Sequence, residues 1–314
     1  MKNKAVAKNS FHLLLLVTVA IVCITFRVSG NAVAFKGKKQ LLQQDLNVLE
    51  DTNGKIVKQK RIRLEKFRDK VECYKIRYLS DELKVVGFVL KPKVEGPKYP
   101  VMIYNRGGNR EFGKITKKTL TYLAYLSSNN YVVLATQYRG NDGGQGREQF
   151  GGKDINDVLN EIPLARSLSF TDPNKIVMLG FSRGGMMTYL AIKEGARIKA
   201  AAVVGGMTDL IQTYEERGDK MKKVIEELVG RNKNEYKKRS AYYWPEKIDV
   251  PVLILHGEDD WRVKVSQAKK LSENLKKLGK VHELVIFPKG DHGLNTHRRE
   301  RNRKIFEWFD KYLQ

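Results

Sequence analysis

The chain has 314 residues, 41% of them hydrophobic, and a formal net charge of +24. This composition is that of a globular protein with a sizeable core, and it excludes a disordered or collagen-like chain. The positive charge would attract anionic partners, but Lys and Arg are scattered along the chain, which favours solvated surface positions. No arginine-rich arm, zinc-finger spacing or base-stacking motif is present, so we expect no nucleic-acid partner.

The first 34 residues have the three-part layout of a secretory signal. A basic start precedes an uncharged apolar run at 13–26, which is followed by VSG and AVA, small-residue patterns that end at residues 30 and 34. The run is shorter than the roughly 20 residues that span a bilayer. We therefore expect export, with cleavage after residue 30 or 34. The alternative is an uncleaved membrane anchor, because Arg27 and nearby lysines hinder translocation.

Residues 35–69 are predicted to be a polar lead-in, and residues 70–314 the folded domain. Alternating runs at 71–80 and 83–92 predict an antiparallel hairpin. Cys73 lies in the first of them, and we expect it to be a small core residue without a disulfide partner.

From residue 100 onward, short apolar runs alternate with segments of helical periodicity. Strands are expected at 100–105, 131–138, 175–181, 199–206, 250–257 and 282–288, and helices at 114–128, 153–168, 184–194, 218–240, 265–278 and 305–312. Pro163 predicts a kink or restart in its helix. This order predicts an α/β fold: a doubly wound, mostly parallel sheet with antiparallel N-terminal strands. Such sheets carry their chemistry at the carboxyl ends of the strands.

The stretch GFSRG (180–184) follows an apolar strand and precedes a helix. It matches G-x-S-x-G, the turn that exposes a nucleophilic serine, here Ser182. The competing interpretation is a glycine-rich turn whose serine caps the helix. The order Ser, acid, His at successive strand ends favours the nucleophile, because Asp259 or Asp260 follows the strand 250–257 and His292 follows the strand 282–288.

Acyl transfer also needs donors for the tetrahedral oxyanion. The backbone N–H of Arg183 is the first candidate, since it directly follows the serine. The second is expected from the loop NRGGN (105–109), at the amide of Arg106 or Gly107. The motifs H-E-x-x-H, G-x-x-x-x-G-K-[ST] and G-x-G-x-x-G are not found, so no metal and no cofactor are expected. His256, at a strand end, is interpreted as a packed, hydrogen-bonded residue.

Five stretches, in order, resemble the catalytic domain of the prolyl oligopeptidase family of serine peptidases, from about residue 70 to the C-terminus: YPVMIYNRGGN, QYRGNDGGQGREQFGGKD, MLGFSRGGMM, ILHGEDDWRV and FPKGDHG. The resemblance implies an α/β-hydrolase fold with Ser182 as nucleophile and His292 as base. The family's HG-x-x-D spacing, which begins here at His256, implies Asp260 rather than Asp259 as the orienting acid.

The sequence departs from the pattern of this family at three points that bear on substrate specificity. About 40 residues separate the apolar run from the first predicted strand, so we expect no β-propeller. RGGN stands where relatives often have His-Gly-Gly-Pro. The glutamates with which dipeptidyl peptidases grip a peptide amino terminus lie on the propeller, so YEERGD (214–219) is not their counterpart. Relatives without a propeller include esterases.

The sequence predicts the residues that contact the substrate less specifically than it predicts the triad. Residues 207–247 fall where these folds insert a helical lid, and Tyr243 in AYYWPEK could form an aromatic wall or pack in the core. Trp261 and Arg262 adjoin the acid. Arg183 could bind a substrate carboxylate or pair with a structural acid. The loop 140–152 borders the pocket or is an internally stabilised turn.

We therefore predict a serine hydrolase that forms an acyl-enzyme, specifically a serine peptidase of the prolyl oligopeptidase type that acts on short peptides. The expected partner is a peptide or small acyl substrate, and no cofactor is expected. An esterase with the same Ser-Asp-His triad is the alternative. A catalytically idle, basic binding protein is the third hypothesis. Membrane association is expected only through the N-terminal segment, and the sequence does not indicate an oligomeric state.

Overall fold

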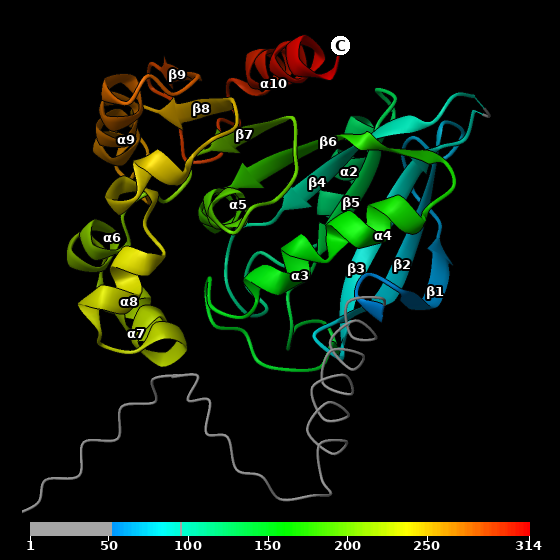
Figure 1. The fold of residues 1–314 in the computed structure, drawn as a ribbon, viewed down its shortest axis with the longest axis horizontal. Helices are drawn as coiled ribbons and strands as arrows, with labels where there is room; N and C mark the ends of the chain where they lie inside the picture. Colours follow the sequence, from blue (N-terminus) through cyan, green and yellow to red (C-terminus); the bar gives the residue numbers. More distant parts are fainter. Residues whose placement is uncertain (1–51, 95) are drawn as a thin grey trace, which may run out of the picture. The chain divides into compact units, whose positions relative to one another are not determined.

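The computed structural model describes residues 52–94 and 96–314, which form one sheet covered by helices on both faces (Figure 1). The predicted signal or anchor lies outside these residues. Within the described ranges, every helix is too short or too polar to cross a membrane.

The sheet has nine strands in the order β1-β2-β3-β5-β4-β6-β7-β8-β9. Their bounds are β1 Ile56–Ile62, β2 Val71–Ser80, β3 Leu83–Pro92, β4 Tyr99–Asn105, β5 Val132–Thr136, β6 Thr171–Phe181, β7 Ala200–Val204, β8 Val252–Gly257 and β9 His282–Phe287. Strands β1 to β3 are antiparallel, β3 pairs antiparallel with β5, and all later pairs are parallel. The predicted α/β-hydrolase architecture is thereby confirmed.

Strand β1 is the element that the sequence did not predict. It lies within the segment 35–69 that we expected to be a lead-in, and it pairs with β2 at the edge of the sheet. Its five central residues are all exposed, so their side chains give no apolar alternation. The sheet therefore begins before residue 70.

The helices divide between the two faces of the sheet. Their bounds are α2 Lys117–Ser127, α3 Ile155–Leu159, α4 Glu161–Ser167, α5 Arg183–Lys193, α6 Leu210–Glu216, α7 Asp219–Val229, α8 Lys233–Lys238, α9 Val265–Lys277 and α10 Arg298–Leu313. The predicted break near Pro163 separates α3 from α4. Helices α6 to α8 come from the predicted lid section, between β7 and β8 in sequence, and lie together at the lower left of Figure 1, below α9.

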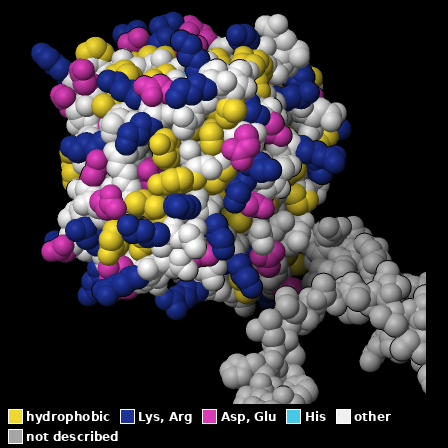
Figure 2. Space-filling view, turned by 60° about the vertical axis from the view of Figure 1, so that its left-hand side comes forward, with side chains coloured by type: hydrophobic (Ala, Val, Ile, Leu, Met, Phe, Trp, Pro, Cys, Tyr) yellow, Lys and Arg dark blue, Asp and Glu magenta, His cyan; other side chains and the backbone are white. Residues whose placement is uncertain are grey.

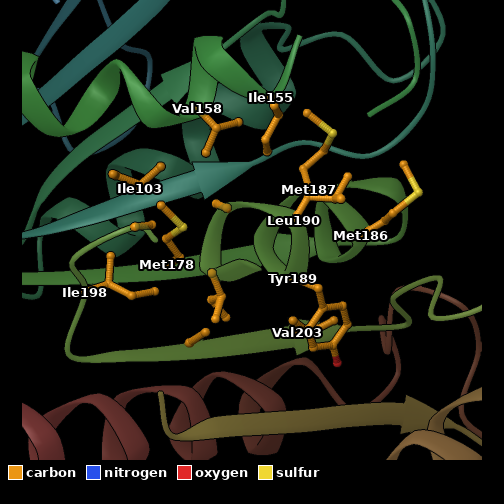
Figure 3. Close-up of a cluster of buried hydrophobic side chains, with 14 of the residues drawn as sticks. Ile103, Ile155, Val158, Met178, Met186, Met187, Tyr189, Leu190, Ile198 and Val203 are labelled. Atoms are coloured by element: carbon orange, nitrogen blue, oxygen red, sulfur yellow. The ribbon is translucent and has the colours of Figure 1, made fainter. Parts of the chain in front are cut away.

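Two apolar clusters hold the layers together. One lies between the sheet and α3, α4, α5 and α9, and the other between the sheet and α2 and α10. The first cluster contains Met187 and Leu190 of α5 together with Met178 of β6 and Val158 of α3 (Figure 3). Because strands β5, β7 and β8 are buried on both faces, their sequences are continuous apolar runs.

The positive charge is distributed over the surface. Figure 2, which brings forward the side of α6 to α9, shows Lys and Arg side chains interspersed with Asp and Glu. On this face, the arrangement agrees with the interpretation that these side chains solvate the surface.

Candidate active site

Ser182 occupies the sharp turn between β6 and α5. Its backbone has φ 57° and ψ −122°, a region that residues with a side chain rarely adopt. Strain of this kind persists only where the surrounding structure enforces it, and it is frequent at catalytic nucleophiles. Here the N–H of Ser182 donates to Val204 O at 2.9 Å, and its carbonyl oxygen accepts from Gly185 N at 2.9 Å.

Asp260 and His292 meet at the carboxyl ends of β8 and β9. The Nδ1–H of His292 donates to Oδ2 of Asp260 at 2.7 Å, and Asp260 is buried. The other carboxylate oxygen, Oδ1, accepts from the N–H groups of Arg262 at 2.8 Å and Val263 at 3.0 Å. Asp259 is exposed. The geometry thus places Asp260 in the position of the orienting acid, and in a neutral imidazole of His292 it keeps the proton on Nδ1, so that Nε2 can accept one.

His256 is a second histidine on the same carboxylate. Its ring is fully buried, and Nε2 lies 2.8 Å from Val263 O and 3.2 Å from Oδ2 of Asp260. A carbonyl oxygen can only accept, so Nε2 carries the proton. Burial raises the pKa of Asp260, but hydrogen bonds from His256 and His292 outweigh it and hold this pKa well below its usual range. The acid is therefore ionised whenever the protein is folded near neutral pH.

The loop after β4 approaches the serine closely at Gly107. A Cβ atom placed on Gly107 would lie 3.1 Å from Cβ of Ser182 and 3.0 Å from Phe181 O. The side chain of Arg106 fixes this loop, because its guanidinium donates to Gly107 O at 3.1 Å and to Gln137 O at 2.7 Å. Of the two candidate residues in this loop, Gly107 lines the same cavity as Ser182 and Arg106 does not.

Arg183 directs its side chain into a buried ion-pair network. The guanidinium is 1% exposed and donates to Oε1 of Glu148 at 2.5 Å and Oδ2 of Asp154 at 2.6 Å. It also donates to Gly108 O at 3.2 Å and stacks on the ring of Phe150. Both carboxylates raise the pKa of Arg183 against the effect of its burial. Of the two interpretations of Arg183, the structure supports pairing with structural acids.

Ser182 and His292 line one cavity of about 260 Å³. Its wall includes Gly107 and Phe112 from the segment between β4 and α2, and Phe150 from the loop 140–152. The lid section contributes Met207, Arg217 and Met221. The loop 140–152 therefore borders the pocket, and it is also internally stabilised, since Asn141 donates to Glu148 within it.

The three predicted substrate-binding residues differ in position. Arg262 lines the cavity of Ser182. Trp261, 63% exposed, lies on another surface hollow with Asp259, and the guanidinium of Arg262 stacks on its ring. Tyr243 is outside the cavity lining and packs against Tyr242 and Lys237. The prediction that Tyr243 forms an aromatic wall is not supported, because its side chain is exposed and does not line the cavity of Ser182.

Sequence reasoning missed Arg217, Glu148 and Asp154. Arg217 donates to Arg262 O at 2.8 Å, so the two cations lie side by side on the cavity wall. No local pattern distinguishes Arg217 from the other cations of the lid. Glu148 lies in the glycine-rich loop 140–152, and an acidic residue among these glycines was the sequence signal that could have indicated it.

Comparison with known proteins agrees with this geometry. The sequence profile of the prolyl oligopeptidase family matches residues 118–314. The uncharacterised peptidase YtmA of Bacillus subtilis is 35% identical over 243 residues, which cover 76% of this chain and 93% of YtmA. The chain belongs to the prolyl oligopeptidase family.

Solved structures show the same fold. An acylaminoacyl peptidase in complex with Z-Gly-Gly-Phe-chloromethyl ketone is 26% identical, with a TM-score of 0.68 over 78% of this chain and 42% of the peptidase. This chain therefore spans less than half of that family member. The acetyl xylan esterase of Paenibacillus sp. R4 covers 87% of this chain and 93% of its own, at 16% identity and a TM-score of 0.64. It shows the fold alone.

Proposed function

We propose that this chain is a serine peptidase that cleaves short peptides through an acyl-enzyme. The observation that carries the proposal is the strained Ser182, which shares one cavity with His292, whose Nδ1 is bound to Asp260. Membership of the prolyl oligopeptidase family and the similarity to an acylaminoacyl peptidase support a peptide substrate.

The chemistry follows from the positions of these groups. His292 takes the proton of Ser182 through Nε2 while Oγ attacks the acyl carbon, and Asp260 stabilises the imidazolium that forms. The N–H groups of Arg183 and Gly107 stabilise the oxyanion; Arg183 opens helix α5, where partial positive charge concentrates. The imidazolium then protonates the leaving amine. Water hydrolyses the acyl-enzyme by the same steps with His292 again as base.

An esterase is the second candidate. The same triad cleaves esters, and an acetyl xylan esterase shares the fold. The cavity wall favours a longer substrate than acetyl, because the apolar side chains of Phe112, Phe150, Met207 and Met221 surround the serine. Arg217 and Arg262 on the same wall can donate hydrogen bonds to peptide carbonyl oxygens.

A two-part experiment tests the proposal. A fluorophosphonate probe should label the wild type and not Ser182→Ala; a folded wild type that resists labelling would exclude a serine hydrolase. Hydrolysis of succinyl-Ala-Ala-Phe p-nitroanilide is then compared with that of p-nitrophenyl acetate. Robust ester turnover with amide turnover at background would favour the esterase. His292→Ala should lose several orders of magnitude in kcat, and adding Ser182→Ala should change little more, because the two residues act as a unit.

We also propose export, from the signal-like residues 1–34. A C-terminally tagged chain should be recovered outside the cytoplasm of a bacterial host, and its N-terminal sequence should begin after residue 30 or 34. Recovery of the full-length chain in washed membranes would favour the anchor.

A further inference from the structure

A second hollow lies between α2 and α10, on the face of the sheet opposite α5. We call it the α2–α10 pocket. Its volume is about 670 Å³, larger than the cavity of Ser182, and the two share no lining residue. Its aromatic wall consists of Phe67, Tyr104, Tyr122 and Tyr125, whose rings contact one another.

The charged residues around this pocket are all basic. They are Lys66, Lys118, Arg298, Arg299 and Arg301, and its lining includes no Asp or Glu. Among the described residues, none of these five cations forms an ion pair with a carboxylate within 4 Å. On the face of α6 to α9, by contrast, Asp and Glu side chains lie among the Lys and Arg side chains (Figure 2). An uncompensated group of cations attracts an anion.

Arg301 is the unusual member of the group. Five arginines in the described part of the chain are buried, and four of them, Arg106, Arg139, Arg183 and Arg239, have a carboxylate within 4 Å. Arg301, 4% exposed, has none. It donates to two uncharged oxygens, Gly293 O at 2.6 Å and Asn302 Oδ1 at 2.8 Å, and its guanidinium lies over the rings of Tyr122 and Phe181. The two rings stabilise the cation but do not neutralise it, so this guanidinium is suited to a counter-ion that comes from outside the chain.

We propose that the α2–α10 pocket binds a small aromatic anion. The anionic group would lie at Arg301 and the neighbouring arginines of α10, and the ring would pack on the tyrosines of α2 and β4. Because Arg301 holds the carbonyl oxygen of Gly293, the residue after His292, the ligand would contact the support of the catalytic loop without entering the cavity of Ser182.

Isothermal titration calorimetry with phenyl phosphate tests the proposal, with inorganic phosphate and benzyl alcohol as the charge-only and ring-only probes. We expect phenyl phosphate to bind at least about tenfold more tightly than either. Arg298→Ser/Arg299→Ser, both exposed positions, should weaken binding at least about tenfold. The control Lys117→Ser/Arg303→Ser removes the same charge, one cation from α2 and the Glu307-paired cation from α10, outside this pocket and should change binding less than about twofold.

Two further variants locate the ligand. Arg301→Gln should abolish binding, and a cooperative urea unfolding transition checks that this variant is folded. If Arg301→Gln does not fold, the Arg298→Ser/Arg299→Ser variant tests the pocket in its place. Arg217→Ser/Arg262→Ser should leave binding unchanged. Loss of binding in that variant would place the anion in the Ser182 cavity and overturn the proposal. Equal effects of the pocket and control variants, or equal affinities for phosphate and phenyl phosphate, would also overturn it.

Discussion

Replacing Arg183 with Met should destabilise the protein strongly. The substitution removes the cation that lies 2.5 Å from Glu148 and 2.6 Å from Asp154, and it leaves two buried carboxylates with one remaining cation, Arg106, 3.8 Å from Glu148. Breaking a buried ion pair by removing one partner costs about 3–5 kcal/mol, because the other charge is left uncompensated. Met preserves much of the apolar stem, so packing changes contribute less.

The free energy of unfolding is measured by urea titration with tryptophan fluorescence. Arg197→Met, at an exposed position without an ion pair, is the control and should stay within about 0.5 kcal/mol of the wild type. Adding Glu148→Gln and Asp154→Asn to the Arg183 variant should restore at least half of the lost stability, because the buried charges disappear. A loss below about 1 kcal/mol for the single variant, or no recovery in the triple variant, would refute the ion-pair reasoning.

Three further predictions concern the same scaffold. Gly184→Ala should cost about 1–3 kcal/mol or more, because its Cβ would lie 1.8 Å from Asn105 O, whereas Gly218→Ala, with open space around it, should be nearly neutral in the same urea assay. Because the pKa of Asp260 is lower in the folded protein, ionised Asp260 contributes stability that is complete above about pH 4, the usual pKa of the side chain, and is lost as pH falls through the folded-state pKa. The unfolding free energy of Asp260→Asn should therefore fall less steeply than that of the wild type between about pH 5 and pH 2.5. Equal slopes for the two proteins would contradict this. Cys73 is buried, and burial raises the pKa of its thiol to about 12, so iodoacetamide should modify it only when urea unfolds the protein. Peptide mass spectrometry measures the modification, and rapid modification of the native protein would show that the strand opens.

The contact between Arg183 and the loop that contains Gly107 and Gly108 links stability to the proposed catalysis. Its guanidinium donates to Gly108 O, and Arg106 donates to Gly107 O, so the ion-pair network fixes the loop that approaches Ser182. Loops of this kind must be held within a fraction of an ångström to stabilise a transition state. Variants that weaken the network are therefore expected to lower kcat before they unfold the protein.

The sequence alone was sufficient to predict most of the strands and helices, because the patterns that indicate them lie within short segments of the chain. Apolar runs such as 250–257 are long and uniform because their strands are covered on both faces, and the glycines around Ser182 mark a turn packed too closely for Cβ atoms. Strand β1 escaped prediction because an exposed edge strand needs no apolar alternation.

Tertiary structure decided which groups face one another. Residue spacing alone did not separate Asp259 from Asp260, whereas the fold buries Asp260 against two histidines and leaves Asp259 in solvent. The partner of Arg183 depended on how the loop 140–152 packs, 29 and 35 residues away in sequence. The sequence by itself determined where a nucleophile, a base and an acid follow the strands, because strand ends are encoded locally. Their pairing, and the absence of an acid beside Arg301 in the described part of the chain, depend on contacts between distant segments, which the folded structure alone specifies.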